Sequence, residues 1–77
     1  MAYQNLSTYP NLSAELRRYG ITQDQMAERI GRPSETVSRW MNGKNAMPVG
    51  ECFRIKEELF PNLSVDYLFA SEPISNQ

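Results

Sequence analysis

The chain has 77 residues, 40% hydrophobic and 22% charged, with a formal net charge of −1; this predicts one globular domain, and no apolar run reaches the ~20 residues of a membrane span. It contains no histidine and a single cysteine, which excludes a Cys/His zinc site and the usual general base of a nucleophilic triad, and its four isolated glycines form no phosphate-binding loop. We therefore expect no enzyme activity, no metal, no cofactor and no membrane partner.

Glycines, prolines and hydrophobic spacing divide the chain into five short helical segments without strand alternation, which predicts an all-α fold. The first helix is expected from Tyr9 to Tyr19, with Thr8 or Ser7 as its cap. Pro10 falls in its first turn, where a missing N–H does no harm, and the next glycine along the chain is expected to end the helix.

The second helix has the clearest local signature. Thr22 and Gln25 form a capping box, in which each side chain can bond the backbone N–H of the other residue. Ile21 and Met26 flank this start as a hydrophobic staple, and Gly31 is expected to end the helix. The inward stripe of this helix is predicted to be Met26, Ala27 and Ile30.

A third helix is expected from Ser34 to Met41, after a turn of the length used in a helix-turn-helix, Gly31-Arg32-Pro33. Its residues separate into an apolar face and a polar face. The apolar face consists of Val37, Trp40 and Met41. The polar row consists of Glu35, Ser38, Arg39 and Asn42, with Ser34 at the N-terminal tip.

Two further helices are expected to complete the domain. The fourth runs from Val49 to Leu59 and ends at Phe60-Pro61-Asn62, and the fifth is short and begins at a Ser64 cap. Cys52 is interpreted as a buried small hydrophobic residue without a redox role. The apolar face of the fourth helix is predicted to contain Val49, Cys52, Phe53 and Leu59, with Ile55 or Lys56 between them.

The ends of the chain are expected to lie outside this unit. The packed domain is predicted for residues 9–69, after an N-terminal extension of residues 1–8 and before a flexible C-terminal tail of residues 70–77. Residues 1–10 have neither a basic start nor an apolar stretch, so no secretory signal is expected. The single cysteine suits a reducing compartment, and the expected location is the cytoplasm.

The charges are unevenly distributed along the chain. Residues 29–50 contain four cations and one acid, a local charge of +3, whereas residues 51–77 contain two cations and five acids, a local charge of −3. A basic segment on an acidic body is compatible with DNA, because contact with phosphate depends on where the cations lie. The basic segment is also the one that contains the third helix.

The polar face of the third helix has the side chains that read base edges in the major groove of DNA. Arg39 can donate a pair of hydrogen bonds to guanine, and Glu35 can accept one from cytosine N4. As an alternative, these two residues lie four apart on a helix and can pair with each other. We expect base contacts from Ser34, Glu35, Thr36 and Arg39. We expect phosphate contacts from Gln23, Arg32, Ser38, Asn42 and Lys44.

These segments resemble the phage repressor and Cro-like helix-turn-helix proteins, also called XRE-type regulators. The resemblance rests on residues 21–31 (Ile-Thr-Gln-Asp-Gln-Met-Ala-Glu-Arg-Ile-Gly), residues 34–40 (Ser-Glu-Thr-Val-Ser-Arg-Trp) and Asn42-Gly43-Lys44, and extends through residues 64–68 to cover most of the chain. It implies a compact, lambda-repressor-like five-helix fold and a transcriptional repressor bound to a near-palindromic operator as a homodimer.

The resemblance also assigns residues. In the family, the residue matching Gln23 binds phosphate, those matching Asn42 and Lys44 hold the DNA backbone, and those matching Ser34, Glu35 and Arg39 face bases. The chain departs from the family at Pro33, where a serine or threonine cap is usual. It also has no lysine or arginine before Arg17, so no minor-groove arm is expected.

Two questions about partners stay open at this point. The acidic segment of residues 51–77 is compatible with a different function, a protein-binding adaptor or an antitoxin that docks a partner protein on the same fold. For the homodimer, Tyr67, Leu68 and Phe69 are candidates for the interface, although the last helix must also cover the core.

Overall fold

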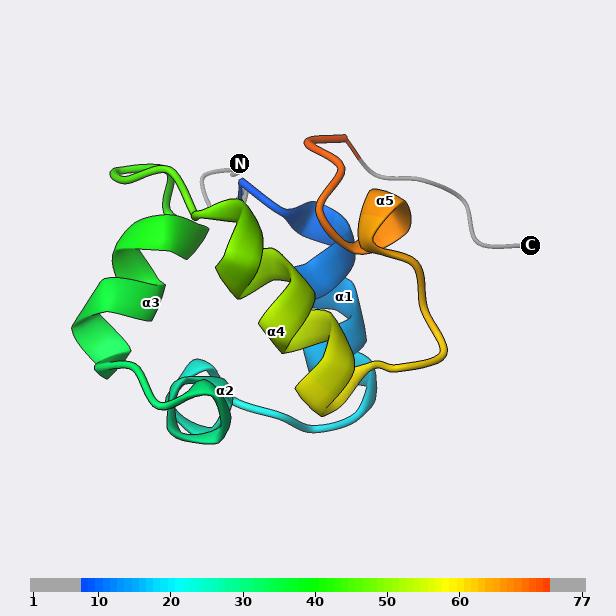
Figure 1. Ribbon diagram of the computed structural model, residues 1–77, viewed down its shortest axis with the longest axis horizontal. Coiled ribbons are helices and arrows are strands. Elements are labelled where there is room, and N and C mark those ends of the chain that lie inside the picture. Colours follow the sequence, from blue (N-terminus) through cyan, green and yellow to red (C-terminus); the bar gives the residue numbers. More distant parts are fainter. Residues whose placement is uncertain (1–7, 73–77) are drawn as a thin grey trace, which may run out of the picture.

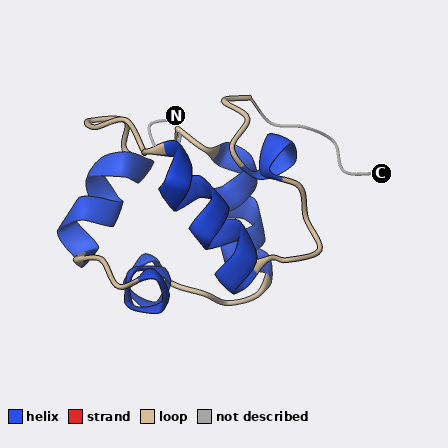
Figure 2. Ribbon diagram, in the orientation of Figure 1, coloured by secondary structure: helices blue, strands red, loops and turns tan. Residues whose placement is uncertain are grey.

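A computed structural model describes residues 8–72 of the chain (Figure 1). These residues form five α-helices. Only helices and loops are coloured in Figure 2, and the absence of strands among the described residues confirms the all-α prediction. The central helix α4 runs between α3 on one side and α5 on the other, and packs on α2 (Figure 1). The helices are α1 (Pro10–Arg18), α2 (Gln23–Ile30), α3 (Ser34–Met41), α4 (Val49–Leu59) and α5 (Val65–Leu68).

The start of α1 differs from the prediction. Its N-cap is Tyr9, not Thr8, and the cap has no side-chain hydrogen bond; Ser7 lies outside the described residues. Thr8 instead connects the start of the chain to the end of α3, because its N–H donates to the carbonyl of Met41 over 3.0 Å. The packed unit therefore includes the last residue of the predicted N-terminal extension.

The other end of the unit also extends beyond the prediction. The buried side chain of Asn11 donates from Nδ2 to the carbonyl oxygens of Tyr67 and Glu72, each over 3.0 Å. Residues 70–72 are thus held against α1, whereas residues 73–77 of the predicted flexible tail lie outside the described part of the chain.

The capping box of α2 is confirmed. The N–H of Thr22 donates to Oε1 of Gln25 over 2.9 Å, and the N–H of Gln25 donates to Oγ1 of Thr22 over 3.0 Å. At the other end, Gly31 adopts a left-handed conformation with φ of 73°, which a residue with a side chain rarely tolerates. Both ends of this helix are therefore specified by local sequence.

The core lies where all five helices meet. The predicted inward residues of α2 and α3 are all buried. The prediction for α4 was wrong in part: Val49 is 70% exposed and Phe53 is 50% exposed, while Cys52 and Leu59 are half-buried. The buried hydrophobic residues are Leu12, Leu16, Met26, Ala27, Ile30, Val37, Trp40, Met41, Met47, Ile55, Phe60 and Leu68.

The face of α4 was misassigned because a charged residue lies on its buried side. Ile55 is fully buried, and Glu51, one turn earlier on the same line of the helix, is only 9% exposed. Glu51 tolerates this position because Arg32 forms an ion pair with it. An assignment by hydrophobicity alone places Val49 and Phe53 inward and rotates the helix away from its true packing face.

A second buried carboxylate joins α1 to α5. Glu15 is 2% exposed, accepts a hydrogen bond of 2.6 Å from the hydroxyl of Tyr67, and has Arg18 at 3.5 Å. The hydrogen bond to Glu15 and partial burial both raise the pKa of Tyr67. The phenol therefore stays protonated and keeps donating to the carboxylate throughout the neutral range.

We predict that Tyr67→Phe lowers the free energy of unfolding by about 1–3 kcal/mol near neutral pH, because it leaves a buried carboxylate oxygen without its donor. The contribution of Tyr67 is present below the unfolded-state pKa of about 10 and is lost as the pH rises through the raised pKa of the folded state. Urea unfolding of both proteins measures this. A difference that did not shrink at strongly alkaline pH would contradict it.

Candidate nucleic-acid interface

The helices α2 and α3 pack against each other across a three-residue turn. Gly31 turns the chain, and the N–H of Arg32 then donates to the carbonyl of Ala27 over 3.0 Å. Pro33 is the N-cap of α3, with an extended backbone and no side-chain cap bond. The helix nevertheless begins at Ser34, as predicted, because proline favours this extended conformation directly before a helix.

The structure brings most of the predicted base-contacting residues to one outward row on α3. Ser34, Glu35 and Arg39 are exposed, and Thr36 is half-buried. The opposite side of the helix is filled by the buried Val37, Trp40 and Met41. One face of α3 is therefore fixed in the core, and the other carries hydrogen-bonding groups to the surface.

Within this row, Arg39 and Glu35 are partners in the free protein. Nη2 of Arg39 lies 3.6 Å from Oε2 of Glu35, and both side chains are more than half exposed. An exposed pair of this kind contributes only about 0.3–0.5 kcal/mol, so it is easily exchanged for another acceptor. The pair therefore holds the Arg39 side chain along the helix in the free protein but leaves it able to bind another acceptor.

The predicted phosphate-contacting residues lie at two places beside this row. Gln23 is exposed in the first turn of α2, where free backbone N–H groups favour an anion. Ser38 and Asn42 lie at the other end, on the last turn of α3, with a hydrogen bond of 3.3 Å from Nδ2 of Asn42 to Oγ of Ser38. Lys44 is exposed just beyond them.

The loop after α3 is held tightly where it passes these residues. The N–H of Lys44 donates to the carbonyl of Arg39 over 2.9 Å. Gly43 has φ of 79°, and a Cβ at this position would lie 2.6 Å from Oγ1 of Thr8. The position therefore requires glycine for both its backbone and its surroundings.

Arg17 is a residue that sequence reasoning missed. It lines a surface pocket together with Gln23, Ser13, Leu16 and Ile21, so it lies on the same surface as the start of α2. The sequence did contain a signal for this placement. Arg17 lies in the last turn of α1, and only a short connection separates that turn from the capped start of α2. A cation beside the positive end of a helix adds to the attraction for phosphate.

Comparison with protein-family models, curated proteins and solved structures finds no match to this chain.

Arg32 is the one predicted phosphate ligand that the structure places in a strong contact with another side chain. Its guanidinium is bonded to Glu51 on α4, and this hydrogen bond raises the pKa of Arg32. Its side chain is about half exposed, whereas that of Glu51 is largely covered. Arg32 thus differs from the other predicted ligands, which lie on the open surface or in exposed pairs.

No group of three or more metal-ligating side chains is present within residues 8–72. None of the described helices has the length and apolar character to cross a membrane.

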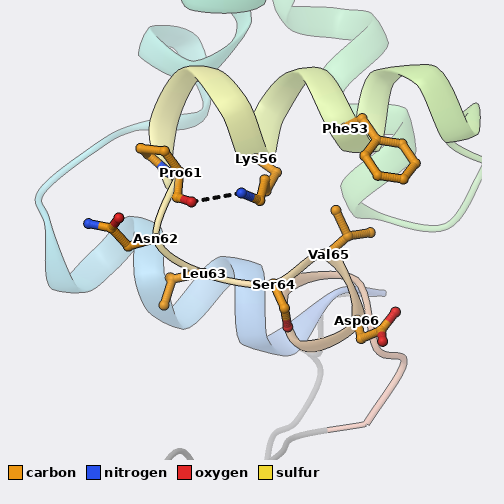
Figure 3. Close-up of a pocket in the computed structure, with 8 residues that line it drawn as sticks. All are labelled: Phe53, Lys56, Pro61, Asn62, Leu63, Ser64, Val65 and Asp66. Atoms are coloured by element: carbon orange, nitrogen blue, oxygen red, sulfur yellow. Dashed lines mark hydrogen bonds between the residues drawn. The ribbon is translucent and has the colours of Figure 1, made fainter.

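A second surface feature lies on the side of α4 away from α3. An open hollow is formed by α4, α5 and the loop between them (Figure 3). Phe53 and Val65 give it an apolar wall, and Nζ of Lys56 donates to the carbonyl of Pro61 over 2.7 Å. Asp66 is exposed, and it lies on the opposite side of Val65 from Lys56 (Figure 3). Phe53, which is 50% exposed, therefore gives this hollow a large apolar side chain at the surface.

Proposed function

We propose that the protein is a sequence-specific, double-stranded DNA-binding transcriptional regulator whose helix α3 enters the major groove. The observation that carries the proposal is the division of α3 into a face locked in the core and an exposed row containing Ser34, Glu35 and Arg39. Such a row, on a helix held by a three-residue turn against a capped helix, is suited to contact base edges.

Each residue of the interface has a distinct chemical role in this proposal. Arg39 donates two hydrogen bonds to guanine, and Glu35 accepts from cytosine N4 or stays beside Arg39. Gln23, assisted by Arg17, binds a phosphate at the start of α2, and Lys44 binds one beyond α3. Phosphate contacts on both sides of the groove would fix the orientation of the reading helix.

The resemblance to the phage repressor and Cro-like regulators adds a finer proposal. It favours a repressor that occupies a near-palindromic operator as a homodimer, with two copies of α3 in major grooves ~34 Å apart along one side of the duplex. The local charge of +3 in residues 29–50 supports binding to DNA, and the overall charge of −1 does not.

Selection of bound sequences from a pool of random duplexes, preceded by titration with mixed-sequence duplex at low salt, tests the function. We expect micromolar or tighter binding to the mixed duplex and an enriched inverted repeat that contains a G·C pair in each half-site. No binding at micromolar protein would overturn the proposal and favour the adaptor or antitoxin, in which the fold docks a protein partner.

For the homodimer, we propose the hollow between α4 and α5 as the interface, and a second copy of the chain as its occupant. The surface is self-complementary, because Lys56 and Asp66 flank the apolar Phe53 and Val65. In a two-fold dimer, Lys56 of each copy can meet Asp66 of the other. The loop after α4 and helix α5, which line the hollow together with α4, lie on the far side of α4 from α3 (Figure 1), so pairing through them would leave the outward row of α3 open.

We predict that Phe53→Asp abolishes dimerisation and lowers the free energy of unfolding by only about 1–2 kcal/mol, because half of the side chain is already exposed in the monomer. Light scattering over a range of concentrations, with the original chain forming dimers at the upper end, measures the first effect. Tyr19→Asp, which changes an exposed aromatic residue outside the hollow, is the matched control. Equal dimerisation of all three proteins would exclude this interface.

A further inference from the structure

Arg32, the cation in the turn between α2 and α3, is bound to Glu51 and has no role in the DNA interface proposed above. Arg32 donates from Nε and Nη2 to the same oxygen, Oε2 of Glu51 in the first turn of α4, over 3.0 and 2.5 Å. Its backbone is also fixed, by the hydrogen bond to Ala27 behind the left-handed Gly31. Both the backbone and the guanidinium of Arg32 are therefore held in place.

The carboxylate of Glu51 depends on this contact. Glu51 is 9% exposed, and its other oxygen, Oε1, is buried without a hydrogen-bond partner among the described residues. If Arg32 left, the carboxylate of Glu51 would have no side-chain hydrogen bond within residues 8–72, while the partial positive charge at the start of α4 would remain near it. Removing the partner of a buried carboxylate costs more than separating an exposed pair, although the half-exposed guanidinium of Arg32 makes this cost smaller than for a fully buried pair.

The two ion pairs near the outward row of α3 should therefore differ in how easily DNA breaks them. The exposed pair of Arg39 with Glu35 is separated by 3.6 Å and is screened by water, so a base edge or a phosphate can replace it. The pair of Arg32 with Glu51 is shorter and its carboxylate is largely covered, so a phosphate must compete with a carboxylate that has no other side-chain partner among residues 8–72.

We propose that Glu51 is a positioning residue that withholds Arg32 from DNA phosphates and thereby lowers the overall affinity and the salt sensitivity of the complex. This proposal rests on the proposed DNA-binding function. It concerns how many DNA phosphates the protein neutralises when it binds. Because each phosphate contact strengthens binding to every sequence, Glu51 weakens binding to operator and random DNA alike and favours rapid release from both.

The salt dependence of binding tests this inference. The logarithm of the association constant falls with the logarithm of the salt concentration, with a slope of about −0.9 for each phosphate contact. For each bound copy of the chain, we expect Glu51→Gln to steepen the slope by about 0.9 and to raise affinity roughly fivefold to tenfold near 0.1 M salt, for random and selected duplexes alike. A bound dimer has the change in slope twice. Glu57→Gln is the matched control, because it also removes one negative charge from α4 but at an exposed position.

A double variant keeps the test sharp if Glu51→Gln folds poorly. Arg32→Gln with Glu51→Gln replaces the pair by two neutral amides, and we expect it to keep the slope of the original chain, since Arg32 makes no phosphate contact there. A slope reduced by about 0.9 for each bound copy of the double variant would overturn the inference, as would equal slopes for Glu51→Gln and Glu57→Gln. Absence of DNA binding by every protein, including the original, would overturn the proposed function as well.

Discussion

Arg39→Ala is expected to remove most of the preference of the protein for its selected operator over random duplex. The loss for each half-site should be about 1–3 kcal/mol, which is roughly fivefold to 150-fold in affinity, because a bidentate arginine contact to guanine has this value. A dimer loses the contact twice. Binding to random duplex should weaken much less, since it depends on phosphate contacts.

The comparison with Gln23→Ala makes this expectation specific. Gln23 lies at the start of α2 and is proposed to contact only phosphate, so its loss should weaken operator and random duplex by the same factor. Fluorescence anisotropy titrations of both variants with both duplexes measure the four affinities. Equal weakening on the two duplexes by Arg39→Ala would show that Arg39 does not read bases.

Leu68→Ala is expected to lower the free energy of unfolding by about 2–5 kcal/mol, a large share of the stability of a small domain. The residue is fully buried in the core, although it belongs to a helix of only four residues. Leu68 was a candidate for the dimer interface, and its complete burial within one chain shows instead that α5 is fastened to the core by this side chain.

Val49→Ala provides the control for this stability change. Val49 was predicted to be buried but is 70% exposed, so its truncation should change the free energy of unfolding by no more than about 0.5 kcal/mol. Urea unfolding followed by circular dichroism at low protein concentration measures both variants without a contribution from dimers. A loss of similar size for the two residues would mean that the packing of α4 and α5 described above is wrong.

The parts of the fold that depend on local sequence could be predicted. The bounds of α3 and α4 agree with the predicted ones, and the start of α2 follows from hydrogen bonds between Thr22 and Gln25, which are three residues apart. The inward face of α3 was also correct, because Val37 and Trp40 are its large apolar residues and the remainder of the helix, apart from Met41 beside them, is polar. Short-range chemistry is enough for these features.

The parts that depend on partners distant in sequence could not be predicted. Glu51 is buried because Arg32 reaches it from nineteen residues earlier in the chain, and Glu15 is buried because Tyr67 reaches it from α5. Neither pairing has a sequence pattern, so a charged residue is assigned to the surface by default. The candidate site shows the same division: its outward row on α3 was predicted, whereas the position of Arg17 beside Gln23 needed the three-dimensional structure.

The close approach of Thr8 to Gly43 has a consequence for engineering the protein toward other target sequences. Ser34, Glu35 and Arg39 are exposed and can be randomised together in a mutant library with little loss of folded members. Gly43 is only four residues beyond Arg39, but a side chain there would have to displace Oγ1 of Thr8, 2.6 Å from its Cβ, and adopt a left-handed backbone conformation that side chains disfavour. A library should therefore vary the first three positions and keep this glycine constant.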